Sequence, residues 1–418
     1  MSTLLIEGGR RLSGSVDVEG NKNAALPLLA ACLLTTEECV LTNVPRIRDV
    51  EVMAQLLVDL GGEVDGIGTT TLRVRCRDVV KDEPDGVMVG RLRGSVLLLG
   101  PLLARRGRAA LAPPGGDFPA RRSIGTHLEA LMAMGARVVD APGHVLECPG
   151  GLRPASVYLY EASVTGTETA LLAASAAPGR SEIRHAACEP HVVELCRFLE
   201  KLGVGVEGAG TSTIRIDGGA RLGGATHTLW GDYIEAGSWA VVAAVTGGEI
   251  DVRGARDADM EVVAAVLKRL NVQCSSDGDL FRVEASRPQA AGRITTGLWP
   301  GFPSDLVSLV TVLATQAEGR TLVHDWLYEL RLFALEQLSG MGADLFLCDP
   351  HRIIVTGPRR LRGRPLDSRD LRSGMALIAA ALAADGVSRV TPLETVERGY
   401  GNLVERLTQL GADVTRLA

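Results

Sequence analysis

Lysine, histidine, aromatic residues and long apolar runs are all scarce in this chain. Its 418 residues include four lysines, seven histidines and 4% aromatic residues, and its formal net charge is −6. Proteins whose main partner is nucleic acid or an anionic membrane need a concentrated basic face, which this balance does not supply. The longest apolar runs, such as 375–384, are too short to cross a bilayer. We therefore expect neither nucleic acid nor membrane as a partner.

Motifs for cofactors are also missing. The eight cysteines contain no Cys-x-x-Cys pair and no basic, apolar leader opens the chain, which is typical of reduced thiols in the cytoplasm. His185 and His191 match no familiar zinc spacing, and a turn before a helix explains them better. Neither a Walker loop nor a post-strand Gly-x-Gly-x-x-Gly occurs, so ATP and NAD have no support. We expect a cytoplasmic protein without a metal or organic cofactor.

The strongest pattern present is a repeated segment, first seen at Leu57–Val64. Five further copies start at residues 131, 199, 267, 338 and 407, so successive copies lie 68 to 74 residues apart. In each copy apolar residues recur at helical spacing, and the fifth residue is of a type that ends helices in the left-handed conformation. These fifth residues are Gly61, Gly135, Gly203, Asn271, Gly342 and Gly411. Strand-like segments follow, as in 72–74 and 353–355, so the sequence predicts six α/β units.

Each unit also has a second helical segment that is rich in Ala and Leu and poor in charge. Such helices should be buried, which favours helices inside and sheets around them. Since single cores stop growing near about 250 to 300 residues, the six units should divide into two bodies of three, with ligands bound between them. The predicted buried helices are 23–34, 93–104, 167–176, 234–245, 304–315 and 371–384.

The loop 112–122 combines three prolines and two glycines with Asp117 and the pair Arg121 and Arg122. Prolines stiffen a loop, and glycines permit backbone angles that other residues avoid. Such a segment can swing as a unit and present its carboxyl group over a bound anion, as an active-site lid does. The alternative is a surface turn between two elements.

Charged residues stand at the starts of several predicted buried helices. Lys22 and Asn23 begin the first, where backbone N–H groups favour a phosphate, although Lys22 could equally be a solvated first-turn lysine. Arg93 and Arg372 begin others, where an arginine opposes the helix dipole and therefore indicates a local anion. Asp305 begins the fifth, and its alternative interpretation is an ordinary N-cap.

Six motifs in order resemble the enolpyruvyl transferases, and the resemblance covers the chain from end to end. It implies an α/β protein of the α+β type with the EPSP synthase-like fold. That fold has two inverse α/β barrel domains, each of three βαβαββ units with buried helices. By analogy one domain is 22–230, with the lid loop 112–122, and the other is 1–21 plus 231–418. The motifs are Gly20-Asn-Lys-Asn-Ala-Ala25, Asn43-Val-Pro-Arg-Ile-Arg-Asp-Val50, Gly115-Gly-Asp117, Phe302-Pro-Ser-Asp305, Asp370-Leu-Arg372 and Glu397-Arg-Gly-Tyr400.

The resemblance also implies a reaction. The branch most similar to this chain transfers the enolpyruvyl group of phosphoenolpyruvate to a hydroxyl of UDP-N-acetylglucosamine, by addition and elimination, in the synthesis of peptidoglycan precursors. Asp305 would accept the hydroxyl proton, and Asp117 would protonate the methylene carbon. Lys22, Arg122 and Arg398 would hold the phosphate, and Arg331 and Arg372 the carboxylate. The other expected substrate-binding residues are Asn23, Arg93, Ser123, Ile124, Ser163, Val164, Leu327 and Asp370.

Departures from the family pattern gather on the side of the acceptor. Asp117 stands where most members have cysteine, so we expect insensitivity to fosfomycin, which forms a thioether with that cysteine. Ser123 to Thr126 replace a segment that grips uridine, and Glu161 stands where relatives have lysine. A paralogue acting on another uridine nucleotide, such as UMP, in a secondary pathway is therefore an alternative. A catalytically silent nucleotide-binding relative is a third, but the retained Lys22, Asp305 and Arg398 argue against it.

Overall fold

The protein is described by a computed structural model that covers residues 2–417, apart from 116–122, 141–144 and 330. Its described residues form two compact units, each with its own hydrophobic core. The C-terminal unit comprises residues 2–19 and 231–417, and the N-terminal unit comprises residues 20–115 and 123–230. Asp117, Arg121 and Arg122 lie outside the described residues.

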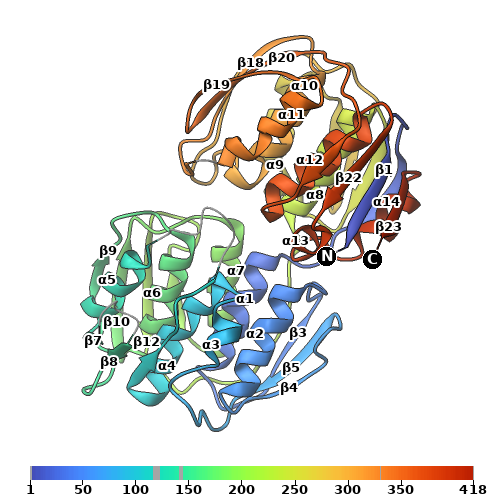
Figure 1. Ribbon diagram of the computed structural model, residues 1–418. Coiled ribbons are helices and arrows are strands. Elements are labelled where there is room, and N and C mark those ends of the chain that lie inside the picture. Colours follow the sequence, from blue (N-terminus) through green and yellow to red (C-terminus); the bar gives the residue numbers. More distant parts are fainter. Residues whose placement is uncertain (1, 116–122, 141–144, 330, 418) are drawn as a thin grey trace. The chain divides into compact units, whose positions relative to one another are not determined.

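In the C-terminal unit three four-stranded sheets surround three helices. Figure 1 shows these sheets, yellow to red with β1 in blue, around α8, α10 and α12. The central helices contact one another, and nearly all of their residues are buried. They are α8 (Tyr233–Thr246), α10 (Val307–Gln316) and α12 (Leu371–Ala383), with η2 (Ser304–Leu306) before α10. The outer helices are α9 (Asp257–Arg269), η3 (Arg331–Glu336), α11 (Gln337–Gly340), α13 (Leu393–Glu397) and α14 (Leu403–Gln409).

Every sheet of this unit has one parallel pair followed by two antiparallel pairs, which is the βαβαββ pattern. A central helix, α8, α10 or α12, directly precedes the second strand of each parallel pair. In two sheets the remaining antiparallel pair follows an outer helix, whereas in the third β23 follows α14 and its antiparallel partner β1 comes from the start of the chain. The orders are β15-β16-β14-β2, β17-β18-β20-β19 and β21-β22-β1-β23. The strands are β1 (Thr3–Glu7), β2 (Ser13–Asp17), β14 (Glu249–Arg253), β15 (Cys274–Asp277), β16 (Leu280–Val283), β17 (Gly292–Thr295), β18 (Gly319–His324), β19 (Asp344–Asp349), β20 (Arg352–Gly357), β21 (Pro365–Asp367), β22 (Val387–Thr391) and β23 (Asp413–Leu417).

The N-terminal unit repeats this design. Its sheets have the orders β13-β3-β5-β4, β11-β12-β10-β9 and β6-β8-β7. Its helices are α1 (Lys22–Cys32), α2 (Arg48–Asp59), α3 (Gly86–Val89), η1 (Arg93–Leu98), α4 (Leu99–Arg106), α5 (Gly125–Ala133), α6 (Val164–Ala176) and α7 (Pro190–Leu202). Its strands are β3 (Cys39–Thr42), β4 (Glu63–Asp65), β5 (Thr71–Arg75), β6 (Arg108–Ala110), β7 (Arg137–Asp140), β8 (Val145–Glu147), β9 (Ser156–Tyr158), β10 (Gly179–Arg184), β11 (Gly205–Glu207), β12 (Thr213–Gly218) and β13 (Ala225–Thr228).

One of the six repeated α/β units departs from the predicted βαβαββ pattern. In the part of the chain that the structure describes, the sheet β6-β8-β7 has no parallel first strand. The segment beside β6 accepts one backbone hydrogen bond from it, from the N–H of Ala110 to the carbonyl of Asp82 at 2.8 Å. Pro84 follows two residues after Asp82, and proline lacks the N–H that a strand ladder needs. The other five sheets follow the predicted order, and the predicted inverse α/β fold is confirmed.

The residues predicted to end the outer helices all have left-handed backbone angles. Their φ values are 103° for Gly61, 100° for Gly135, 105° for Gly203, 60° for Asn271, 103° for Gly342 and 92° for Gly411. A residue with a Cβ atom is strained at such angles, and asparagine tolerates them best after glycine. The repeated Gly or Asn therefore sets the point at which each helix turns into its following strand.

The central helices are nearly charge-free, and Glu168 on α6 is a notable exception. Its side chain is buried, with 1% of the residue exposed, and its Oε1 has no hydrogen-bond partner among the described residues. Burial first, and the neighbouring Glu189 second, raise the pKa of Glu168 well above its ordinary value of 4.5. Burial thus favours the protonated form of this carboxyl group in the folded protein.

We expect Glu168→Met to stabilise the protein at neutral and alkaline pH. As pH rises above about 4.5, the unfolded chain releases a proton that the folded protein keeps, so the wild type loses stability. The variant lacks this loss, so its advantage should be smallest at pH 4 and larger at pH 8. Denaturant unfolding at both pH values measures it. Glu129→Met, at an exposed position of α5, is the matched control, with an effect within about 0.5 kcal/mol at either pH. A pH-independent advantage at Glu168 contradicts the prediction.

Candidate active site

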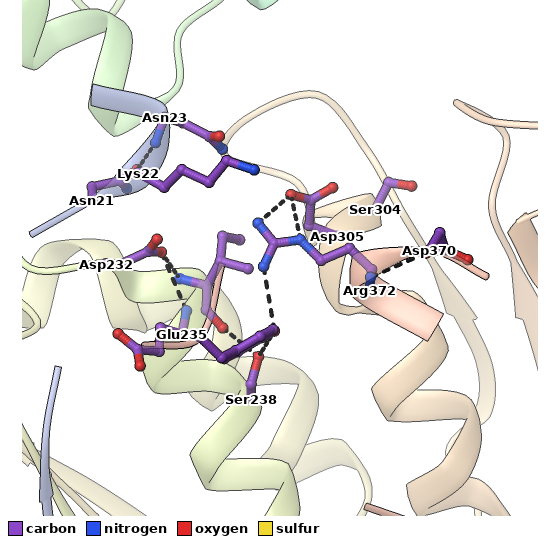
Figure 2. A network of polar contacts seen from close by, with 12 residues as sticks. Asn21, Lys22, Asn23, Asp232, Glu235, Ser238, Ser304, Asp305, Asp370 and Arg372 are labelled. Atoms are coloured by element: carbon purple, nitrogen blue, oxygen red, sulfur yellow. Dashed lines mark hydrogen bonds and ion pairs between the residues drawn. The ribbon is translucent and has the colours of Figure 1, made fainter. Parts of the chain in front are cut away.

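The most densely paired charged group of the C-terminal unit is centred on Asp305. Its Oδ1 lies 3.0 Å from Nη1 of Arg331, and its Oδ2 lies 2.9 Å from Nη2 and 3.1 Å from Nε of Arg372. Figure 2 shows Asp305 facing the guanidinium group of Arg372. Asp305 lies in η2, whose N-cap is Pro303 without a side-chain cap bond. The carboxylate therefore bridges two arginines, and the interpretation as an ordinary N-cap is wrong.

Arg331 is held indirectly by a buried carboxylate, that of Asp325, through the hydroxyl of Ser304. Its Nη1 donates to Oγ of Ser304 at 2.9 Å, and that hydroxyl donates to Oδ2 of Asp325 at 2.6 Å. Asp325 is fully buried and also accepts from Thr296 at 2.8 Å. The guanidinium carbon lies 4.4 Å from the ring centre of Tyr328. Burial acts to lower the pKa of Arg331, but its anionic neighbours, led by Asp305, raise it above the ordinary value.

Arg372 is placed by the start of α12. Asp370 is the N-cap of this helix, because its side chain accepts from the backbone N–H groups of Arg372 at 3.0 Å and Ser373 at 2.9 Å. The side chain of Arg372 is buried, and its Nη1 donates to the hydroxyl of Tyr400 at 3.3 Å. Burial acts to lower the pKa of Arg372, but Asp305, as the largest opposing influence, helps raise it above the ordinary value. The cation thus persists although it is buried.

In the N-terminal unit Lys22 begins α1. Asn21 caps the helix, accepting from the N–H of Asn23 at 2.8 Å, and its own N–H donates to the carbonyl of Trp230 at 2.8 Å. The Nζ of Lys22 lies 2.7 Å from Oδ2 of Asp49, and only 14% of its side chain is exposed. Lys22 is therefore a mostly buried, paired cation, and the interpretation as a solvated first-turn lysine is wrong.

Other predicted residues of the N-terminal unit lie at helix starts. Arg93 begins η1, and its Nη2 donates to the carbonyl of Ser123 at 2.9 Å. Ile124 is the N-cap residue of α5. Ser163 is the N-cap of α6, whose first residue is Val164, and its Oγ accepts from a backbone N–H of the first turn at 3.1 Å. The first of these contacts brings Arg93 and Ser123 together. Ser163 lies at the N-terminal end of α6, where the first backbone N–H groups of the helix are located.

The remaining predicted residues of the C-terminal unit lie near this network or in turns. The backbone N–H of Leu327 donates to the side chain of Asp325 at 3.3 Å, so Leu327 contacts the buried carboxylate that holds Ser304 beside Arg331. Arg398 is the C-cap of α13, a short helix that the sequence did not predict. Within the described ranges no cluster of His, Cys, Asp and Glu side chains is arranged to hold a metal ion. Nor is any helix of those ranges long and apolar enough to cross a membrane.

Sequence reasoning missed three residues that hold the arginine pair. Asp325 anchors Ser304, Ser304 bonds Arg331, and Tyr400 bonds Arg372. Ser304 and Tyr400 lie inside recognised motifs, which was the available signal, whereas Asp325 had none. This arrangement can bind anions. Two adjacent guanidinium groups already hold the carboxylate of Asp305, and the further N–H donors of each guanidinium group can bind a second carboxylate.

Comparison with known proteins identifies the family. The family model of EPSP synthase (3-phosphoshikimate 1-carboxyvinyltransferase) matches residues 6–407. The UDP-N-acetylglucosamine 1-carboxyvinyltransferases of Bradyrhizobium diazoefficiens and Treponema denticola are 42% and 40% identical to the chain, covering 99% of it and 97% and 99% of their own lengths.

A solved structure agrees with these relatives. The crystal structure of the enolpyruvyl transferase NikO from Streptomyces tendae is 25% identical and superposes with a TM-score of 0.89, covering 99% of this chain and 98% of that one. Family, relatives and fold all agree, and the chain belongs to the EPSP synthase family and is an enolpyruvyl transferase.

Proposed function

We propose that the chain transfers the enolpyruvyl group of phosphoenolpyruvate to a hydroxyl of UDP-N-acetylglucosamine and releases phosphate. The relatives at about 40% identity carry that activity in their names and match almost the whole chain. The observation that carries the proposal is the carboxylate of Asp305 between the guanidinium groups of Arg331 and Arg372. A site that holds one carboxylate in this way is suited to receive the carboxylate of phosphoenolpyruvate.

The same arrangement gives Asp305 its task. When the substrate carboxylate takes over the two guanidinium groups, Asp305 loses its partners and becomes available as a base. It then takes the proton of the acceptor hydroxyl as that oxygen bonds to C2 of phosphoenolpyruvate. The methylene carbon gains a proton from Asp117, which gives a tetrahedral adduct. Loss of a proton from that carbon and departure of phosphate from C2 restore the double bond and release the product.

The phosphate is assigned to Lys22, Arg122 and Arg398. Lys22 supports this role because it is mostly buried at the start of α1, whose N–H groups favour an anion. Asp370 serves as the cap that holds Arg372, so we assign it a supporting role. The remaining assigned substrate-binding residues are Asn23, Arg93, Ser123, Ile124, Ser163, Val164 and Leu327.

A second acceptor, another uridine nucleotide such as UMP, is favoured by one observation. Glu161 is exposed two residues before Ser163, the N-cap of α6. A carboxylate there opposes a diphosphate, whereas a nucleotide with fewer phosphates is repelled less. The fold likeness to NikO is compatible with this alternative.

An assay of phosphate release tests both versions. The protein is incubated with phosphoenolpyruvate and, in separate reactions, UDP-N-acetylglucosamine, UMP or shikimate 3-phosphate. We expect release with UDP-N-acetylglucosamine and a product heavier by one enolpyruvyl group in the mass spectrum. Release with UMP alone would transfer the proposal to the second acceptor. Release with none of the three would contradict both.

Fosfomycin tests the chemistry at Asp117 separately. A carboxyl group does not form the thioether that fosfomycin makes with cysteine, so we expect no time-dependent inactivation of the wild type. Asp117→Cys should gain it, because a thiolate is a far stronger nucleophile. The matched control is Cys348→Ser, which removes an exposed thiol and should change nothing. Progressive inactivation of the wild type would contradict the assignment.

A further inference from the structure

Tyr400 is a fully buried tyrosine whose hydroxyl touches Arg372. Its oxygen lies 3.3 Å from Nη1 of Arg372 and 2.8 Å from Oγ of Ser238 on α8. Both neighbours are also buried. Figure 2 shows Ser238 on the side of Arg372 away from Asp305. The phenol thus stands between a cation of the candidate active site and a central helix.

The contacts fix the direction of every hydrogen bond in this row. The hydroxyl of Ser238 donates to the carbonyl of Ile234 at 2.7 Å, so its proton is already used. A guanidinium group only donates. The phenol of Tyr400 must therefore accept from Arg372 and donate to Ser238. Burial raises the pKa of Tyr400 above its ordinary value, so the phenol keeps the proton that this arrangement needs.

The other donors of Arg372 face elsewhere. Its Nε and Nη2 bond Asp305, so the plane of the guanidinium group is set by Asp305 on one side and Tyr400 on the other. If a substrate carboxylate displaces Asp305, only the phenol remains of these side-chain contacts. Without the hydroxyl of Tyr400, the guanidinium group of Arg372 would be free to rotate about the terminal bonds of its side chain at the stage when it must orient the substrate.

We propose that Tyr400 is a positioning residue that holds the guanidinium group of Arg372, through Ser238 and α8, in the orientation that receives the carboxylate of phosphoenolpyruvate. This inference rests on the proposed role of Arg372, and it adds a residue that touches no substrate. Because this row of hydrogen bonds ends on a backbone carbonyl of α8, it offers Arg372 a contact that does not involve Asp305.

The test is Tyr400→Phe, which keeps the ring and removes the hydroxyl. Loss of a hydrogen bond to a charged group predicts a KM for phosphoenolpyruvate raised about 10- to 100-fold, with the KM of the acceptor within about 2-fold of the wild type. Ser238→Ala, which leaves the phenol able to accept from Arg372, should raise it less. Thr311→Val is the control, because Thr311 is buried in the same unit and its hydroxyl donates within its own helix to the carbonyl of Val307, and it should leave both KM values unchanged.

A second measurement separates this inference from the proposed function. Crystal structures of Tyr400→Phe and Thr311→Val should show the guanidinium group of Arg372 rotated in the first and unmoved in the second. That result supports positioning even if the wild type shows no transfer to any acceptor. An unrotated Arg372 in Tyr400→Phe, or a KM for phosphoenolpyruvate within about 2-fold of the wild type in an active enzyme, overturns it. Equal rises in both KM values also overturn it, since they indicate a general structural effect.

Discussion

Asp305→Ala is expected to lower kcat by about 100- to 10,000-fold while phosphoenolpyruvate still binds. Asp305 is the proposed base for the acceptor hydroxyl, and its removal leaves that proton without an acceptor. The same change removes the carboxylate that now occupies Arg331 and Arg372. We therefore expect the dissociation constant of phosphoenolpyruvate to stay the same or to fall, because the substrate no longer competes with a side chain for these arginines.

Calorimetric titration with phosphoenolpyruvate and steady-state kinetics measure the two effects. Asp305→Asn is a companion variant, since an amide keeps the shape of the side chain but is not a base, and it should lose turnover to a similar extent. The control is Asp349→Ala, which removes a partly exposed carboxylate paired with Arg352 and should leave both quantities unchanged. Substantial turnover in Asp305→Ala would remove Asp305 from its role. Loss of binding without loss of turnover would reverse the assignment.

The fold was predictable from sequence because its signals are local. A residue with left-handed φ can be recognised by type alone, and Gly61 and Asn271 mark their helix ends for the same steric reason. The charge-free segments became central helices because no other placement buries so much apolar surface. Among the described residues, the lack of a parallel strand beside β6 was not predicted, since a repeat suggests regularity and only Pro84 indicated a break.

The polar network of the site was less predictable because its partners lie far apart in the chain. Arg372 bonds Asp305 across 67 residues, and Ser238 meets Tyr400 across 162. Sequence placed Arg331 and Arg372 near a carboxylate by resemblance, but it did not indicate that Asp305 itself occupies them. The burial of Asp325 and Glu168 was also hidden, because a single carboxylate in an apolar stretch is as readily a solvated residue.

Arg372→Lys tests whether the shape of the guanidinium group matters beyond its charge. Lysine keeps the positive charge, but its compact ammonium group cannot contact Asp305 and Tyr400 with separate nitrogens as Nε, Nη1 and Nη2 do. With two oriented contacts to a carboxylate lost, we expect the KM for phosphoenolpyruvate to rise about 100-fold and kcat to fall.

The control for this change lies close by, in the loop that precedes α12. Arg369→Lys replaces an exposed arginine, 68% of whose side chain is accessible, that pairs with Asp367, and it should leave KM and kcat within about 2-fold of the wild type. Kinetics at varied phosphoenolpyruvate and saturating acceptor measure both variants. A near-normal KM in Arg372→Lys would mean that charge alone suffices at this position. The substrate carboxylate would then have to be assigned to the guanidinium group of Arg331 alone.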